Sequence, residues 1–136
     1  MFVIQNKNTM KVAIQSNRAP KPIGPYSQAI QHGSMVFTSG QIAIDPNSGV
    51  YTSLSVKEET HLVMKNLMAL LEEVNLSFDN VVKASIFLQD MGDFSEVNEI
   101  YTQYLNAPYP ARETVQVAML PKGAKVEISM IAIQNS

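Results

Sequence analysis

The sequence predicts a single domain of the α+β class, with a sheet and two helices. Short runs alternate apolar with polar residues, which is typical of strands that bury one face. Two longer segments instead repeat apolar residues at intervals of three and four, and this spacing predicts amphipathic helices. The chain has 136 residues, of which 46% are hydrophobic and 16% are charged, so it can bury one core without cross-links.

The N-terminal segment predicts an extension, a strand and a turn. Residues 1–9 are expected to be an extension that precedes a domain over residues 10–136, because the periodic pattern begins only after them. Residues 12–15 alternate as a first strand, which a proline-rich cluster ends. A Gly-Pro pair then fixes the backbone before Tyr26. This residue is therefore either a tyrosine held at a cleft or a half-buried tyrosine after a turn.

Residues 27–31 and 35–39 predict a hairpin. The two runs flank a short turn that contains His32, which is expected to be exposed to solvent. The second run leads into Gly40. A glycine in a strand indicates either a bulge or a place where another group approaches the backbone closely, and we expect one of these two features at Gly40.

A capping box predicts where the first helix begins. The Ser55 side chain can accept a hydrogen bond from a backbone N–H group of the first turn, while the Glu58 side chain can reach back to the backbone N–H of Ser55. Apolar residues then recur at helical spacing, which predicts a helix over residues 56–74 with His61 on its exposed side. A strand at residues 81–88 follows, so the helix is expected to cross over between two strands.

A second helix is expected to begin at residues 93–96, which include capping residue types, and to end before Pro108. Its core side is predicted to carry Phe94, Val97, Tyr101 and Tyr104. Asn98 lies between these positions. Periodicity leaves open whether Asn98 is solvated or points into a cleft.

The last stretch, residues 110–133, predicts two strands joined by a Pro-Lys-Gly turn. Arg112 opens the first strand. Glu127 interrupts the apolar run of the second strand, and it points away from the apolar face formed by its neighbours. A carboxylate among β-branched residues is expected to be partly desolvated, and therefore to need a partner or a chemical role.

These two charged residues are difficult to bring together in a simple hairpin. If residues 115–120 paired directly with residues 126–131, Arg112 and Glu127 would point to the same face but lie roughly 20 Å apart along it. One small ligand could not contact both. Either the two strands are not neighbours, or the two residues meet across a subunit boundary.

Composition argues against several classes of function. The chain has no cysteine and two histidines without a metal-binding spacing, which excludes disulfide and thiolate sites and leaves a His-ligated metal unsupported. The net charge of −2 argues against nucleic-acid binding. No apolar run could span a bilayer and no signal-peptide pattern is present, so we expect no membrane association and a cytoplasmic location.

Four stretches carry a resemblance to a known family. They are Gly24-Pro25-Tyr26-Ser27-Gln28-Ala29, Thr38-Ser39-Gly40-Gln41, the segment from Asp90 to Tyr101, and the segment from Pro110 to Ile128. These stretches resemble the RidA/YjgF family of reactive-intermediate (enamine/imine) deaminases, and the resemblance covers nearly the whole chain from Met10 onward. The last stretch is the most specific, with Arg112 and Glu127 fifteen residues apart.

The resemblance implies a fold and an assembly. The fold would be chorismate-mutase-like, with a mixed six-stranded sheet and two helices on one face. Three subunits would form a homotrimer with a ligand cleft at each interface. The implied reaction is the hydrolysis of 2-iminobutanoate or 2-iminopropanoate, released by pyridoxal-phosphate dehydratases, to a 2-oxo acid and ammonia. It needs no metal and no organic cofactor.

The resemblance also implies roles for individual residues. Arg112 would bind the carboxylate of the 2-imino or 2-oxo acid, and Glu127 would position or activate water. The backbone at Thr114 would contact the ligand. The remaining cleft positions implied by the resemblance are Tyr26, Ser39, Gly40 and Asn98.

The chain departs from the family pattern at three positions. Thr114 replaces a cysteine that is often found there, which matters little if the main chain makes the contact. Glu113 stands where a small residue is common, and it puts a negative charge next to Arg112 in the sequence. Ser129 replaces a second glutamate, which indicates that Glu127 is the functional one.

Two other functions remain open on the sequence. A regulatory module could hold a small carboxylate in the same cleft without turning it over, and Glu113 next to Arg112 is the feature that keeps this alternative open. The second alternative is an RNA-cleaving or translation-inhibiting protein. The acidic balance of the chain argues against it.

Overall fold

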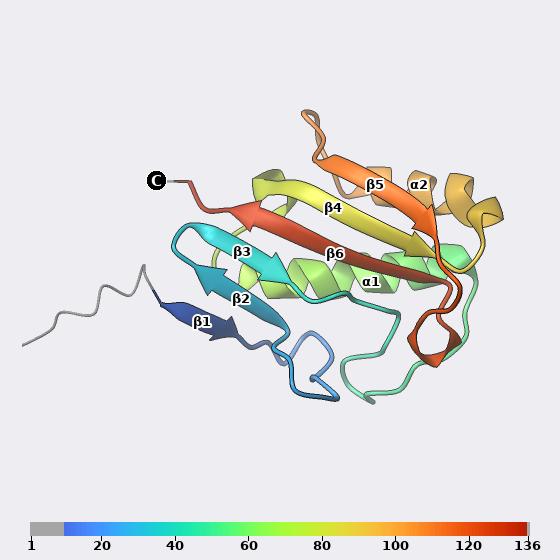
Figure 1. Ribbon diagram of the computed structural model, residues 1–136, viewed down its shortest axis with the longest axis horizontal. Coiled ribbons are helices and arrows are strands. Elements are labelled where there is room, and N and C mark those ends of the chain that lie inside the picture. Colours follow the sequence, from blue (N-terminus) through green and yellow to red (C-terminus); the bar gives the residue numbers. More distant parts are fainter. Residues whose placement is uncertain (1–9, 136) are drawn as a thin grey trace, which may run out of the picture.

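A six-stranded sheet with two helices on one face forms the structure (Figure 1). The computed structural model describes residues 10–135, and the predicted extension, residues 1–9, lies outside them. The strands are β1 (Lys11–Ile14), β2 (Ala29–His32), β3 (Met35–Thr38), β4 (Val81–Leu88), β5 (Ala111–Gln116) and β6 (Val126–Ile133). The helices are α1 (Val56–Glu72) and α2 (Phe94–Gln103). The predicted α+β fold is confirmed.

The sheet is mixed, with the strand order β1-β2-β3-β6-β4-β5. Strands β4 and β5 are parallel, and the other neighbours are antiparallel. Strands β2 and β3 form the predicted hairpin, in which His32 pairs with Met35 and is the last residue of β2 rather than part of the turn. The mixed six-stranded sheet expected from the resemblance is confirmed.

Strands β5 and β6 are not neighbours, because β4 lies between them. Both strands were predicted from the sequence, which left open whether they are neighbours, and the alternative in which they are not is confirmed. The chain segment β4-α2-β5 is a parallel crossover unit that puts β5 at the edge of the sheet, so the chain must pass the end of β4 before it enters β6. The segment through α1 likewise joins β3 to β4, with β6 inserted between these two strands.

The two helices begin in different ways. In α1 the predicted capping box is present, since Ser55 Oγ accepts the Glu58 N–H at 3.1 Å and Glu58 Oε2 accepts the Ser55 N–H at 3.1 Å. In α2 the expected cap is missing, because Asp93 has a helical backbone and its side chain makes no capping bond. Within residues 10–135, neither helix has the length and apolar character needed to cross a bilayer.

Contacts between the helices correct the prediction for His61. This residue is half-buried rather than on the surface, and its Nδ1 atom lies 2.8 Å from the hydroxyl of Tyr104. The two rings meet edge to face. Helical periodicity identifies the side of α1 that faces the sheet. It does not indicate that the side carrying His61 contacts Tyr104, in the segment after α2.

The two faces of the sheet differ in how they are covered. On the helix side, Val126 and Ile128 of β6 have no exposed surface. On the opposite side, Met35 and Phe37 of β3 are each 38% exposed, and Ile133 of β6 is 37% exposed. On this second face, called the open face below, these apolar residues of β3 and β6 are not covered by either helix within residues 10–135 (Figure 1).

Candidate active site

Glu127 lies on the open face of the sheet, near the start of β6. Its neighbours Val126 and Ile128 point to the core, as the sequence predicted, so the Glu127 side chain faces the other way. The side chain is half-buried, and this burial raises the pKa of Glu127 above its ordinary value. A carboxyl group with a raised pKa binds a proton more readily than an exposed glutamate does.

Gly40 lies directly against the Glu127 side chain. A Cβ atom at position 40 would be 2.8 Å from Glu127 Cδ and 3.0 Å from Glu127 Oε2. The two segments are brought together by an isolated bridge, in which Gln41 and Ile128 exchange backbone hydrogen bonds of 2.9 and 3.1 Å. The predicted close approach at this glycine is confirmed, and the approaching group is the carboxylate itself.

Glu127 borders a cavity of about 380 Å³. Ser39, Gly40 and Tyr26 also line it, so four of the residues implied by the resemblance lie in one place. Tyr26 is 50% exposed and also lines an adjacent cavity of about 400 Å³, which favours the reading of a tyrosine at a cleft over a half-buried turn residue. Other lining residues include Lys21 and the apolar side chains of Ile23, Ile42, Ile44 and Pro121.

Arg112 lies apart from this cavity, against helix α2. Its Nη1 atom donates a 2.6 Å hydrogen bond to Asn98 Oδ1. The guanidinium carbon lies 5.1 Å from the centre of the Tyr101 ring and 5.6 Å from that of Phe94. Asn98 is therefore not simply solvated, because its side chain orients Arg112. Phe94 was expected in the core, but it is 38% exposed and packs on the guanidinium instead.

A separate cavity, of about 310 Å³, lies beside Arg112 and is lined by Asn98, Tyr101, Thr102, Tyr109, Pro110 and Arg112. The hydroxyl oxygens of Tyr101 and Thr114 are buried and have no hydrogen-bond partner among residues 10–135. Such unpaired buried groups can bond to a ligand. Within the same residues, no group of three or more His, Asp or Glu is placed to hold a metal ion.

Arg112 and Glu127 project from opposite faces of the sheet. Arg112 pairs with Ala84 of β4, which has no exposed surface and lies on the helix side. Glu127 pairs with Phe87, three positions further along β4 and hence on the open face. The shared face that direct pairing of β5 with β6 would have produced is not present, because β4 lies between these two strands. One subunit therefore does not bring them to a common ligand.

Glu113 follows Arg112 in the sequence but points to the other face. Its carboxylate forms an ion pair with Lys83, at 3.0 Å, and accepts a hydrogen bond from Ser85 Oγ at 3.1 Å. The bond to Lys83, followed by that to Ser85, lowers the pKa of Glu113. Its charge therefore does not act directly on a ligand of Arg112 in the same subunit, because alternate residues of a strand face opposite ways. Ser129, which pairs with Ser85, lies on the same face as Glu113.

Phe94 and Tyr101 are residues of the Arg112 cluster whose roles sequence analysis missed. Together with Asn98 they occupy positions that follow one stripe of α2. This stripe is visible in the sequence as two aromatic residues around an amide. The sequence does not show that this stripe contacts Arg112, because Arg112 belongs to a strand that follows the helix.

The chain is closely similar to known proteins. The family model described as Endoribonuclease L-PSP matches residues 16–134. A 2-iminobutanoate/2-iminopropanoate deaminase from Homo sapiens is 46% identical over 122 residues, which cover 90% of this chain and 89% of the human protein. A putative endoribonuclease from Thermotoga maritima superposes with a TM-score of 0.90 and 43% identity, covering 93% of this chain and all of that one (100%). E. coli TdcF, solved with bound serine, has a TM-score of 0.87 and 41% identity, over 91% of this chain and 99% of that one.

Proposed function

The chain belongs to the RidA/YjgF family, and from this membership we propose that it is an enzyme that hydrolyses 2-imino acids to 2-oxo acids and ammonia. The proposed substrates are 2-iminobutanoate and 2-iminopropanoate, which the name of the human relative gives for that protein. The observation that carries the proposal is the half-buried carboxylate of Glu127, held by Gly40 at the wall of a cavity large enough for a small acid.

In this proposal Arg112 binds the carboxylate of the substrate. A guanidinium group can donate two parallel hydrogen bonds to a carboxylate, and so fix the position of the adjacent imine carbon. Asn98, Phe94 and Tyr101 hold the guanidinium before the ligand arrives, which lowers the entropy lost on binding. The unpaired hydroxyl of Thr114 and its backbone lie two positions along the same face and are proposed as further ligand contacts.

Glu127 is proposed as the group that activates water. It accepts a proton from the water molecule as the water oxygen bonds to the imine carbon, and it then returns this proton, so that the imine nitrogen gains one and a carbinolamine forms. The hydroxyl proton then passes to the nitrogen, the carbon–nitrogen bond breaks, the nitrogen leaves as ammonia, and the carbon–oxygen bond becomes the ketone of the 2-oxo acid. The raised pKa of Glu127 supports this role, because a more basic carboxylate accepts the proton of water more easily. Tyr26, Ser39 and Gly40 are proposed to line the cleft around the reacting atoms.

We propose a homotrimer in which each site combines Arg112 of one subunit with Glu127 of the next. Two observations support this assembly. The two residues face opposite sides of the sheet within one chain, and the open face carries exposed apolar residues such as Met35 and Phe37. Exposed apolar residues on a sheet face are usually covered by another element or another subunit.

Two other functions have less support. The serine bound to E. coli TdcF shows that this relative holds a small amino acid, which is also compatible with a module that binds without catalysis. However, Glu113, the feature that kept this alternative open, pairs with Lys83 on the face opposite to Arg112. An endoribonuclease is named in the family description, but a net charge of −2 gives little attraction for RNA phosphates.

The test is the release of 2-oxobutanoate from threonine in a coupled assay with a threonine dehydratase, in a buffer free of amines. The wild type is expected to accelerate imine hydrolysis above the spontaneous rate. Arg112→Ala is expected to lose roughly 10²-fold or more in kcat/KM, because it removes the charged partner of the carboxylate. Glu127→Gln is expected to lose roughly 10²- to 10⁴-fold in kcat. If the wild type stays at the spontaneous rate while it binds 2-oxobutanoate, the enzyme proposal fails and the binding module replaces it.

A further inference from the structure

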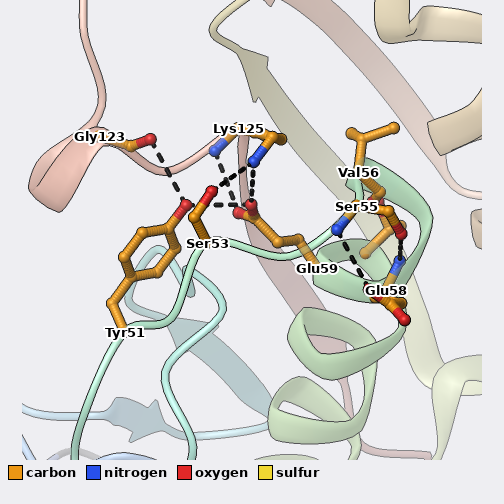
Figure 2. Close-up of polar contacts among 9 residues, drawn as sticks. Tyr51, Ser53, Ser55, Val56, Glu58, Glu59, Gly123 and Lys125 are labelled. Carbon is orange, nitrogen blue, oxygen red and sulfur yellow. Dashed lines mark hydrogen bonds and ion pairs between the residues drawn. The ribbon is translucent and has the colours of Figure 1, made fainter.

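Glu59 is a charged residue of α1 with no exposed surface. Figure 2 shows its carboxylate at the centre of a group of polar contacts. Its Oε1 atom accepts the backbone N–H of Lys125 at 3.1 Å. Its Oε2 atom accepts the Lys125 ammonium at 3.1 Å and the Tyr51 hydroxyl at 3.0 Å. A buried carboxylate is costly unless it is paired and hydrogen-bonded, and here both oxygens are bonded.

These contacts join two segments that form walls of the cavity beside Glu127. Lys125 lies two residues before Glu127, and the turn that precedes it contains Pro121, which lines the cavity. Tyr51 forms a bridge with Ile44, which lines the same cavity. Glu59 therefore connects α1 to both walls at once (Figure 2).

The segment before β6 needs such an anchor because of the sheet topology. The chain leaves edge strand β5, passes the end of β4 and enters β6 without the turn of a direct hairpin to set its register. Both backbone groups of Lys125 are bonded at this point: its N–H to Glu59, and its carbonyl to the N–H of Gln89 at 3.1 Å. The position of Lys125 in turn determines where the β6 strand begins.

A second buried polar side chain of α1 holds the other wall. Asn66 lies two helical turns after Glu59, on the same side of α1, and donates a 3.0 Å hydrogen bond to the carbonyl of Ile44. Both residues are buried at 1% exposure or less. The helix thus presents two polar groups toward the cavity walls, within a face that otherwise packs against the sheet.

We propose that Glu59 is a positioning residue for the proposed reaction: through Lys125 it holds the start of β6 so that Glu127 meets Gly40 and the cavity in one fixed place. Glu59 does not touch the ligand itself. The inference rests on the proposed function, because it assigns to Glu59 the placement of the proposed catalytic carboxylate. It predicts an effect on the chemical step and not on binding, since Arg112 lies on the opposite face of the sheet.

The test compares kcat, KM and melting temperature for the wild type, Glu59→Gln and Glu59→Met in the full chain, with imine hydrolysis as the assay. Methionine keeps the volume but removes the acceptor, so kcat is expected to fall by roughly ten- to a hundredfold with KM unchanged. Glutamine keeps an acceptor for the Lys125 N–H but loses the ion pair, so an intermediate, several-fold fall is expected. Glu72→Gln is the matched control, because it removes another carboxylate of α1 that pairs with Arg18 at the surface.

A graded loss of kcat, measured well below the melting temperature of each variant, supports the proposal. Melting temperatures that fall while kcat stays at the wild-type value overturn it, since Glu59 would then be structural only. If Glu59→Met does not fold, Glu59→Gln decides: a wild-type kcat in this variant overturns the proposal.

A second readout does not depend on catalysis. Amide hydrogen exchange at Gln41 and Ile128 reports the bridge that holds Glu127 against Gly40. Faster exchange at these two amides in the Glu59 variants, but not in Glu72→Gln, supports the positioning role even if the wild type proves inactive toward imines. In that case the proposed function alone fails. Unchanged exchange overturns the inference.

Discussion

At the scale of single residues, the space beside Glu127 explains why position 40 is a glycine. The Glu127 carboxylate occupies the volume that a Cβ atom at this position would need. Such an approach lets the backbone form one wall around the carboxylate, and it limits the positions that the carboxylate can take. Gly40 and Glu127 are thus one structural unit, although 87 positions separate them in the chain.

We predict that Gly40→Ala lowers kcat by roughly 10²-fold. The added methyl group would displace the Glu127 carboxylate, and a displacement of about 1 Å is enough to disrupt catalytic alignment. The fold should be kept, with a change in unfolding free energy of about 1 kcal/mol or less. Kinetics and thermal melting check both statements. Gly24→Ala is the control, since a Cβ there meets Tyr26 at an ordinary 3.5 Å. A Gly40→Ala enzyme with wild-type kcat would contradict the assigned contact.

The raised pKa of Glu127 predicts opposite effects on stability and activity. Because the folded state holds this proton more tightly than the unfolded chain does, ionisation lowers stability as pH rises through the raised pKa, and the cost is fully present above it. Glu127→Gln should therefore stabilise the protein at pH 7, by less than about 1 kcal/mol because water screens a half-exposed group. The gain should vanish below the ordinary glutamate pKa of about 4.3.

Melting curves of the wild type and Glu127→Gln across this pH range measure the difference. In the same range, kcat/KM of the wild type should rise with pH as Glu127 ionises, with a midpoint above the ordinary glutamate value. A stabilisation that grows as pH falls would show that the pKa is lowered rather than raised.

At the scale of elements, α1 both covers the sheet and carries the polar groups that hold the cavity walls. Its apolar residues Val63, Met64 and Leu67 have no exposed surface, and Glu59 and Asn66 are buried with them. The start of the helix is set locally by its capping box, so the position of Glu59 one turn later follows from Ser55. Helix α2 carries the residues that orient Arg112, but it begins without a side-chain cap.

We predict that the two helix starts respond differently to mutation. Ser55→Ala should lower the unfolding free energy by about 1 kcal/mol, because an N–H group of the first turn loses its acceptor. Asp93→Ala should cost less than about 0.5 kcal/mol, since this side chain makes no capping bond. Urea unfolding of both variants provides the comparison. An equal loss in the two variants would mean that Asp93 does cap α2.

At the scale of the whole molecule, the strand order separates the proposed site into two halves. The half on the open face contains Glu127, and the half on the helix side contains Arg112. Each half borders its own cavity, and each is held by contacts within the chain. A complete site in the proposed form requires two copies, related by a rotation that brings the edge strand β5 of one subunit to the open cavity of another.

Mixing two inactive variants tests this arrangement. In a trimer assembled at random from equal amounts of Arg112→Ala and Glu127→Gln subunits, about a quarter of the interfaces should combine an intact Arg112 with an intact Glu127. Co-expressed variants should therefore recover roughly that fraction of wild-type activity, whereas each variant alone stays inactive. Activity that does not recover, in trimers shown by mass spectrometry to be mixed, would place both residues of a site in one subunit.

The sequence by itself determined the features that depend on near neighbours in the chain. The capping box at Ser55, the strand at residues 81–88, the hairpin before Gly40 and the outward direction of Glu127 all follow from local patterns, and the structure confirms each one. The family motifs added the overall fold. These features need no knowledge of which distant segment lies alongside.

Only the tertiary structure decided which strands are neighbours and therefore which residues meet. An alternating pattern is the same whichever strand pairs with it, so the sequence left open whether β5 and β6 are neighbours, and the structure shows β4 between them. That insertion puts Arg112 and Glu127 on opposite faces, and the crossover through α2 brings Asn98 to Arg112. The buried Glu59 is explained in the same way, because its partners Tyr51 and Lys125 reach it only when the chain is folded.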